Sequence, residues 1–198
     1  MAETYAFLGT GSMGGAILDG LVAGGGDATI RSTTRSSSIS RPGVESRSTE
    51  SNPEANRWAV DGATVIVIGV KPAMVTDVLR DVADVLDPAA VIVSVAAGGT
   101  TATMESVVAN PVVRAMPNTP ALIGKGVTGI AKGSRATAEH INVARALFEV
   151  VGWVLELPET RIDALSTISG SGPAYVFHAM EQWTTAAVQL GFDESDAR

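Results

Sequence analysis

The sequence predicts a doubly wound α/β fold, in which a parallel sheet domain over residues 1–158 is followed by the start of an all-helical domain over residues 159–198. Short apolar, β-branched runs alternate with amphipathic helical stretches as far as about residue 157, a pattern typical of parallel strands covered by helices. Beyond residue 159 the strand pattern stops, and one long apolar helix is expected. These two observations separate a sheet domain from an incomplete helical one.

The first strand and the first helix flank a glycine-rich turn. Residues 5–8 form an apolar run, the turn reads Gly9-Thr10-Gly11-Ser12-Met13-Gly14, and apolar residues then recur at helical spacing over 16–22. In such a turn the first glycine permits the bend, the second lets the backbone approach a pyrophosphate, and the third lets the helix pack on the strand. The phosphates are expected at the N–H groups of the helix start. The pattern predicts a Rossmann-like dinucleotide site.

The end of the second strand indicates which dinucleotide binds. Residues 28–33 read as that strand, Thr34, Arg35 and the serines at 36–38 follow it, and no acid occurs from residue 29 to residue 42. A carboxylate here would hold the ribose 2′-hydroxyl of NAD, whereas hydroxyls and a guanidinium favour a 2′-phosphate. The sequence therefore predicts NADP(H). The alternative is that Arg35 is only a solvated loop charge.

The remaining elements follow in order. Residues 31–51, rich in serine, threonine and arginine, predict a mobile surface loop. Apolar, β-branched runs predict strands at 64–70, 91–95, 112–115, 127–131 and 153–157. Helical spacing predicts helices at 53–60, 75–86, 101–108 and 138–151. A last helix over 174–190 has Pro173 in its first turn and is apolar nearly all round, so another subunit or further chain must cover it.

Composition excludes several classes of function. The chain has no cysteine, which excludes disulfides, thiolate catalysis and cysteine zinc sites, and no metal site is predicted. A net charge of −7 argues against a nucleic-acid partner. No apolar run reaches the roughly 18 residues of a membrane span, so no membrane partner is expected. Because no secretory signal is recognisable, the expected location is cytoplasmic.

Five motifs occur along the chain: the turn over residues 9–14, Val70-Lys71-Pro72, Ser94-Val95-Ala96-Ala97-Gly98, Arg114-Ala115-Met116-Pro117-Asn118-Thr119-Pro120 and Ser169-Gly170-Ser171-Gly172-Pro173-Ala174-Tyr175. In this order and spacing they resemble the pyrroline-5-carboxylate reductases, and the last two are the specific ones. The resemblance covers essentially the whole chain and is weakest over residues 31–51. It implies reduction of 1-pyrroline-5-carboxylate to L-proline, in proline biosynthesis, with NADPH or NADH as the hydride donor.

The resemblance also implies roles for single residues. Those expected to cradle the pyrophosphate are Leu8, Gly9, Thr10, Gly11, Ser12 and Met13. Those expected at the rest of the cofactor are Thr34 and Arg35 at the ribose phosphate, Asn56 at the adenosine ribose, and Val70, Lys71, Pro72, Ala96 and Ala97 along the cleft. Met116, Asn118 and Thr119 are expected near the nicotinamide, and Asn118, Ser171 and Gly172 at the substrate.

The sequence departs from the family in one respect. Members continue into further helices, which build an interlocked homodimer and carry a Ser-Pro-Gly-Gly-Thr-Thr loop over the substrate, and no such loop occurs here. We therefore expect the 198-residue chain to form a homodimer or higher homo-oligomer through the 174–190 helix, or to aggregate. Without the closing loop it is expected to reduce the substrate poorly or not at all.

No catalytic dyad is evident, and the catalytic residues stay unknown. Reduction of a protonated imine can rely on positioning and electrostatics. Lys71 is a weak candidate for the proton donor, and a cofactor contact is the preferred interpretation of it. His140 and His178 fall inside predicted helices and are expected to be structural or exposed. Ser171 is expected to bond the substrate carboxylate, to cap the helix begun by Pro173, or to do both.

Two other functions stay open. The β-hydroxyacid dehydrogenases share the G-x-G-x-M-G opening, but that family uses a lysine on a helix after the sheet domain, and no lysine follows Lys132. The second alternative is a shortened paralogue that binds NADP(H) without catalysis.

Overall fold

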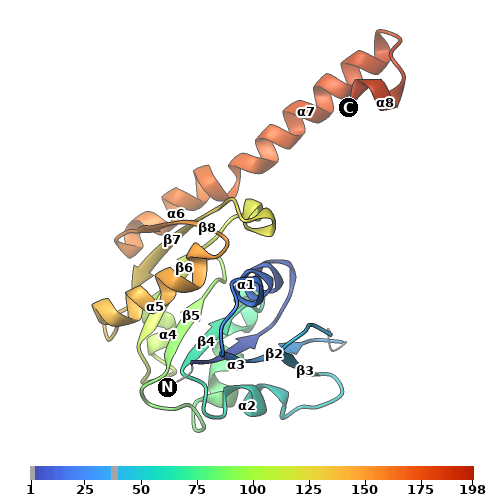
Figure 1. Ribbon diagram of the computed structural model, residues 1–198. Coiled ribbons are helices and arrows are strands. Elements are labelled where there is room, and N and C mark those ends of the chain that lie inside the picture. Colours follow the sequence, from blue (N-terminus) through green and yellow to red (C-terminus); the bar gives the residue numbers. More distant parts are fainter. Residues whose placement is uncertain (1–2, 37–39) are drawn as a thin grey trace.

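The computed structural model describes residues 3–36 and 40–198 (Figure 1). Within them an eight-stranded sheet has the order β3-β2-β1-β4-β5-β6-β7-β8. The strands are β1 (Thr4–Leu8), β2 (Thr29–Thr34), β3 (Val44–Ser48), β4 (Val65–Ile68), β5 (Val91–Ser94), β6 (Val112–Met116), β7 (Gly126–Lys132) and β8 (Gly152–Glu156). The α-helices are α1 (Ser12–Ala23), α2 (Ala55–Val60), α3 (Val75–Val82), α4 (Thr101–Glu105), α5 (Ala138–Glu149), α6 (Ile162–Leu165), α7 (Gly172–Gln189) and α8 (Glu194–Ala197). Short 3-10 helices are η1 (Pro72–Met74), η2 (Thr119–Ile123) and η3 (Glu159–Arg161), and η4 (Ser166–Gly170) is a π-helical turn.

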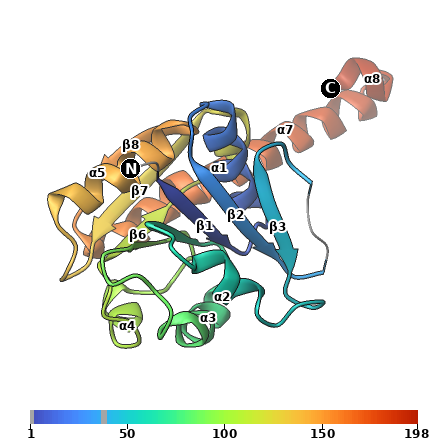
Figure 2. The same ribbon diagram turned by 60° about the horizontal axis from the view of Figure 1, so that its bottom comes forward.

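The strand order confirms a doubly wound sheet. β1 pairs in parallel with β2 on one side and with β4 on the other, where Tyr5 lies opposite Ile30 and Val65. Helices α1 and α5 cover one face of the sheet, and α2, α3 and α4 cover the other (Figure 2). Phe7 packs in the core under α1 and α5, whereas Leu8 packs in the core on the opposite face. β4 is apolar throughout, and β5 is apolar except for Ser94 at its end, because both faces of these strands are buried.

The last two strands depart from the parallel pattern. β7 runs antiparallel to β6, with Ala115 opposite Ile130, and β8 is again parallel to β7. The predicted doubly wound parallel sheet is therefore confirmed for β1 to β6, while β7 and β8 at this edge run in the opposite direction. The connection over residues 117–125 is shorter than the dozen or more residues that a parallel crossover needs, so the chain returns beside β6 in the opposite direction.

The prediction of a surface loop over 31–51 is wrong at Val44–Ser48, where the structure has a strand. Val44–Ser48 form β3, which pairs in parallel with β2 at the edge of the sheet; residues 37–39 lie outside the described residues. The strand is polar because it is an edge: Glu45 and Arg47 are exposed while Ser48 is buried. The guanidinium of Arg47 lies 3.9 Å from the centroid of the Trp58 ring. Four helices end earlier than predicted, α3 at Val82, α4 at Glu105, α5 at Glu149 and α7 at Gln189.

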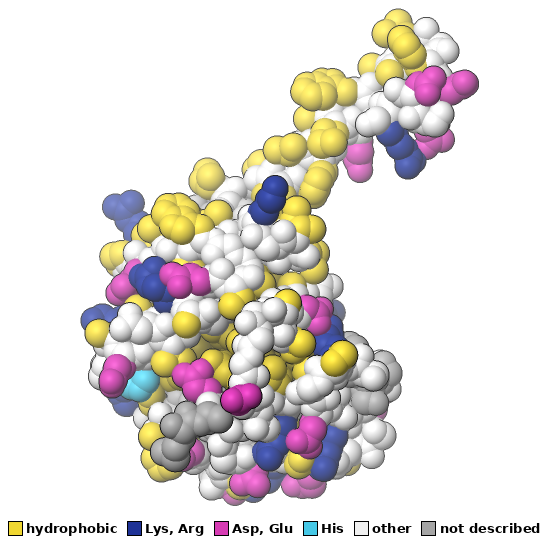
Figure 3. Space-filling model, in the orientation of Figure 1, with side chains coloured by type: hydrophobic (Ala, Val, Ile, Leu, Met, Phe, Trp, Pro, Cys, Tyr) yellow, Lys and Arg dark blue, Asp and Glu magenta, His cyan; other side chains and the backbone are white. Residues whose placement is uncertain are grey.

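Helix α7 leaves the sheet domain and carries no buried side chain (Figure 1). Its large apolar side chains are exposed, and hydrophobic side chains, shown in yellow, cover much of the projecting helix in Figure 3. Between 43% and 81% of the surface is exposed for Val176, Phe177, Met180, Trp183, Val188 and Leu190. None of the helices in the described part of the chain has the length and apolarity needed to cross a membrane.

Candidate functional site

A pocket of about 540 Å³ opens at the carboxyl ends of β1, β2 and β4. The strand order reverses there, since β2 lies on one side of β1 and β4 on the other. Ligands of open α/β sheets bind at such a reversal. The lining residues are Gly9, Thr10, Gly11, Thr33, Thr34, Arg35, Ser36, Thr49, Asn56, Gly69, Val70, Lys71, Met74 and Val78.

The glycine-rich turn forms the floor of this pocket. Gly9 has a φ of 89°, and its N–H donates to the carbonyl oxygen of Thr33 at 3.2 Å. A Cβ atom on Gly9 would lie 2.7 Å from Cγ1 of Val70, and one on Gly14 would lie 2.7 Å from the carbonyl oxygen of Gly9. The first and third glycines are therefore required by the close approach of strand, turn and helix.

The start of α1 presents free donors to the pocket. Gly11 is the N-cap residue, no side chain caps the helix, and its first turn carries no acid. The N–H groups of Ser12 and Met13 have no acceptor within the helix, and the helix dipole adds positive charge at this end. A Cβ atom on Gly11 would meet no atom within 4 Å, so open space lies above the second glycine. This end of the pocket fits a pyrophosphate.

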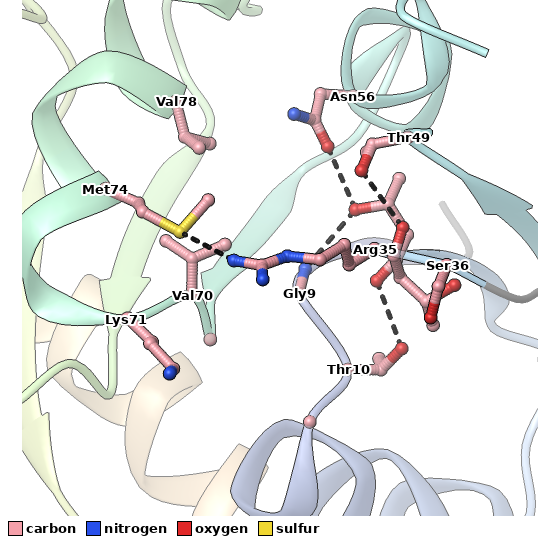
Figure 4. A pocket seen from close by; sticks show the side chains of 14 residues that line it. Gly9, Thr10, Arg35, Ser36, Thr49, Asn56, Val70, Lys71, Met74 and Val78 are labelled. Carbon is pink, nitrogen blue, oxygen red and sulfur yellow. Dashed lines mark hydrogen bonds between the residues drawn. The ribbon is translucent and has the colours of Figure 1, made fainter. Parts of the chain in front are cut away.

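The charged side chains of the pocket fit an anionic ligand. Among the described residues that line it, Arg35 and Lys71 carry charge, and both are cations in a chain of net charge −7. Arg35 extends across the pocket from the end of β2, and its Nη2 donates to Sδ of Met74 at 3.8 Å (Figure 4). A thioether is a weak acceptor, so an anionic oxygen can readily replace it. The donors and cations together suit a phosphate-bearing dinucleotide.

Asn56 lies where an adenosine ribose was expected. Its Oδ1 accepts a hydrogen bond from Oγ1 of Thr33 at 2.9 Å, which orients the amide at the pocket wall beside Thr49 (Figure 4). The hydroxyl of Thr33 thus links the end of β2 to α2.

The pocket gathers part of the expected cofactor set. Gly9, Thr10, Gly11, Thr34, Arg35, Asn56, Val70 and Lys71 line it. The side chain of Leu8 is fully buried, and Met13 packs against the core, so these two offer only backbone to a ligand. Ser12, Pro72, Ala96 and Ala97 are outside the lining, and their roles stay predictions. Of the serines expected at the 2′-phosphate, Ser36 lines the pocket, whereas Ser37 and Ser38 lie outside the described residues. Sequence reasoning missed Thr33, Thr49, Gly69, Met74 and Val78.

The two most specific motifs meet at a second place. Nδ2 of Asn118 donates to the carbonyl oxygen of Ser169 at 3.0 Å, and its Oδ1 accepts from the N–H of Val127 at 2.8 Å. Asn118 is 7% exposed and follows β6, whose carboxyl end lies at the same sheet edge as those of β4 and β5. Its amide therefore clamps the turn η4 onto the sheet domain. A π-helical turn often marks a functional site, and no sequence signal predicts this one.

The expectation that Ser171 caps the last helix is wrong. Its backbone is helical, with φ −91° and ψ −25°, and its side chain makes no capping bond. The hydroxyl instead donates to the carbonyl oxygen of Ser166 at 3.5 Å. An N-cap residue needs extended backbone, but η4 runs directly into α7 and leaves no break at which a cap could form. Its role at the substrate, with Gly172, stays a prediction.

Of the remaining candidate residues, Lys71 lies at the pocket and the two histidines do not. Lys71 lines the pocket beside Val70, which supports a cofactor contact. Nδ1 of His140 accepts from the N–H of Thr137 at 3.0 Å within a capping box, and the side chain of His178 is 72% exposed. The structural or exposed character predicted for both histidines is confirmed. In the described residues no group of acidic or histidine side chains is arranged to hold a metal ion.

Comparison with known proteins agrees with this geometry. The family model described as NADP oxidoreductase, coenzyme F420-dependent, matches residues 4–98, and that of pyrroline-5-carboxylate reductase dimerisation matches residues 159–198. A pyrroline-5-carboxylate reductase of Corynebacterium melassecola is 38% identical over 98% of this chain and 74% of its own length. The reductase structure from Coxiella burnetii is 32% identical with a TM-score of 0.82, and covers 99% of this chain and 74% of its own. The structure of a Plasmodium falciparum pyrroline carboxylate reductase with NADP bound is 25% identical with a TM-score of 0.83, and the match covers 99% of this chain and 72% of that one.

Proposed function

This chain belongs to the pyrroline-5-carboxylate reductase family, and we propose that it reduces 1-pyrroline-5-carboxylate to L-proline with NADPH held in the pocket at the start of α1. One observation carries the proposal. The acid-free pocket, lined by Arg35 and Lys71, shares a sheet edge with the Asn118 clamp that joins the two most specific motifs of the family. A site for a phosphorylated dinucleotide and the entry to the helical domain therefore adjoin the same row of strand ends.

The chain's own residues bind and orient the cofactor. Bound NADPH supplies the hydride that reduces the carbon–nitrogen double bond. The N–H groups of Ser12 and Met13 hold the pyrophosphate, and Arg35, with Thr34, holds the 2′-phosphate. Asn56 donates to the adenosine ribose through the amide that Thr33 orients. Lys71 adds a positive charge at the cleft, and in our proposal it contacts the cofactor rather than protonating the product.

The substrate half rests on Asn118 and η4. Because both ends of its amide are bonded within the protein, Asn118 acts on the substrate by holding the Ser169 segment in place. Ser171 and Gly172 follow directly and offer a hydroxyl and an open backbone to the substrate carboxylate. Met116 and Thr119, on either side of this clamp, are proposed to lie near the nicotinamide. Positioning of this kind can lower the activation barrier for hydride transfer substantially, even where no side chain acts as a strong general acid.

The matched dimerisation segment supports assembly between copies of the chain. α7 exposes Phe177, Met180 and Trp183, and each large apolar side chain contributes roughly 1.5–3 kcal/mol when buried. We propose that a second copy covers this helix in a homodimer or higher homo-oligomer. A cytoplasmic location, which suits a chain without cysteine, stays a prediction.

The test begins with cofactor binding. Fluorescence titration is expected to show tighter binding of NADPH than of NADH, and Arg35→Ala is expected to lose about ten- to a hundredfold in NADPH affinity, because a charge-assisted contact is lost. Arg80→Ala is the matched control, since Arg80 pairs with Asp77 on the surface of α3. Equal wild-type affinities for the two cofactors would contradict the proposal.

Reduction is then followed as loss of NADPH absorbance with 1-pyrroline-5-carboxylate, with the Corynebacterium melassecola relative as positive control. Imine-dependent oxidation that is absent without enzyme is the expected result. Tight NADPH binding with no imine reduction would instead favour the alternative of a non-catalytic NADP(H)-binding protein. Light scattering on the same sample measures assembly, and a strictly monomeric species would refute the role given to α7.

A further inference from the structure

We propose that Ser48 and Thr49, at the carboxyl end of β3, are positioning residues that set the preference for NADPH over NADH. They do so by holding the backbone from which the side chains of Thr34 and Arg35 reach the 2′-phosphate. The inference rests on the proposed function, and it gives a role to the edge strand that the sequence predicts as a loop.

Two carbonyl groups at the end of β2 are each held twice. The carbonyl oxygen of Thr34 accepts from the N–H of Thr49 at 2.9 Å and from Oγ1 of Thr49 at 3.2 Å. The carbonyl oxygen of Arg35 accepts from Oγ of Ser48 at 2.8 Å and from the N–H of Glu50 at 3.0 Å. Two side chains and two backbone groups of one short segment thus hold the stretch that carries the phosphate-binding side chains.

Arg35 depends on this support because its own side chain has little else to hold it. Its guanidinium is exposed, and the 3.8 Å contact to Sδ of Met74 is weak. A long arginine side chain has many rotamers to lose on binding. Holding its backbone leaves only the side chain to be ordered by the ligand, which is the general advantage of preorganisation. Ser48 is 7% exposed, so water does not compete for its bond.

The two cofactors differ only by the 2′-phosphate, and this makes the role specific. Displacing Arg35 weakens contacts to a phosphate that NADH lacks, while the turn at Gly9 and the start of α1 serve both cofactors equally. A merely structural role for Ser48 would lower both affinities together. The ratio of the two dissociation constants therefore separates positioning from general stabilisation.

The same strand supplies a matched control. Ser46 lies two residues before Ser48 and on the same face of β3, since side chains alternate along a strand. Its Oγ is buried and, within the described residues, has no hydrogen-bond partner. Ser46→Ala and Ser48→Ala remove the same hydroxyl from the same face, but only the second removes a bond to Arg35.

The experiment titrates NADPH and NADH against the wild type and these variants, with a thermal melt of each. Ser48→Ala is expected to weaken NADPH binding about three- to tenfold, in line with the loss of the bond from Oγ to the carbonyl oxygen of Arg35, and to leave NADH unchanged. The second bond of this oxygen, from the N–H of Ser51 at 3.5 Å, is long and does not involve β2. Ser46→Ala is expected to change neither affinity, and Ser48→Thr, which keeps the hydroxyl, to restore the ratio. Should Ser48→Ala not fold, Thr49→Val, which removes the bond from Oγ1 to the carbonyl oxygen of Thr34, is expected to lower the ratio in the same direction.

The outcomes distinguish the two proposals. A wild type that prefers NADPH, together with folded variants at 48 and 49 that keep the full ratio, overturns the positioning role and leaves the proposed function standing. Equal binding of both cofactors by the wild type overturns both. An equal fall in both affinities assigns Ser48 to stability alone and also refutes the proposal.

Discussion

Replacing Gly14 by alanine would put a methyl group into a space that the fold has already filled. A Cβ atom there would lie 2.7 Å from the carbonyl oxygen of Gly9, a separation that van der Waals repulsion forbids. The obstacle is backbone, not the end of a flexible side chain, so relief requires α1 to move away from the turn. Such a movement also changes the pocket floor, since Gly9 and Thr10 line it.

The magnitude follows from a comparison with the next residue. Gly14 and Gly15 both lie in α1, so either alanine gains up to about 1 kcal/mol of helix propensity. At Gly15 the added Cβ atom would meet only Nη2 of Arg41 at 3.1 Å, and that side chain can shift. Overpacking against fixed structure costs typically 1–3 kcal/mol. Because the propensity gain cancels, Gly14→Ala is expected to be about 1–3 kcal/mol less stable than Gly15→Ala.

Thermal unfolding and cofactor titration together test this reasoning. For a domain of this size 1 kcal/mol corresponds to about 2–4 °C in Tm, so the melting points of the two variants are expected to differ by about 2–12 °C. Gly14→Ala is also expected to bind NADPH more weakly, while Gly15→Ala binds as the wild type does. Equal melting points and equal affinities for the two variants would show that the contact between Gly14 and the turn is not tight in solution.

Three further predictions concern other parts of the molecule. Gly11→Val is expected to keep the far-ultraviolet circular dichroism and melting point of the wild type, because a Cβ atom at this position meets no protein atom within 4 Å. It is expected to lose NADPH binding, because the side chain would occupy the space for the pyrophosphate. A folded variant that still binds NADPH would contradict this. Burial, followed by the hydrogen bond and charge of Glu3, raises the pKa of Tyr5 above its ordinary value, so its stabilising contribution is complete below about pH 10 and is lost as the unfolded chain ionises above that. The Tm of the wild type is therefore expected to fall more steeply between about pH 9.5 and pH 11 than that of Tyr5→Phe, and parallel curves would refute the assignment. Glu159→Ala is expected to lower the free energy of unfolding by about 1–3 kcal/mol, measured by chemical denaturation. Glu159 accepts hydrogen bonds from the N–H and the hydroxyl of Thr101, each at 2.7 Å, and lies 3.7 Å from the buried Arg114. Glu181→Ala, at an exposed position, serves as control, and an equal effect of the two substitutions would refute the stabilising role of Glu159.

The sequence by itself determines the central half of the sheet and the floor of the site. The apolar runs of β4 and β5 are buried on both faces, as expected for strands inside a sheet that helices cover on both sides. The glycine spacing at 9, 11 and 14 also determines the turn, because the absence of a side chain is itself the requirement. The sequence also shows that α7 is largely apolar and needs a cover, which agrees with the absence of buried side chains on this helix in the structure.

The tertiary structure decided what depends on partners distant in the sequence. β3 is polar and becomes a strand because β2 pairs with it, so no local propensity separates it from a loop. The direction of β7 was decided by the shortness of its connection to β6, since an apolar run is buried equally well in either orientation. Asn118 and Ser169 are 51 positions apart and meet only when the helical segment folds back on the sheet. Hydrogen bonds between such distant groups have no sequence periodicity, and for that physical reason the contributions of Thr33 and Thr49 to the ribose end of the pocket became visible only in the folded chain.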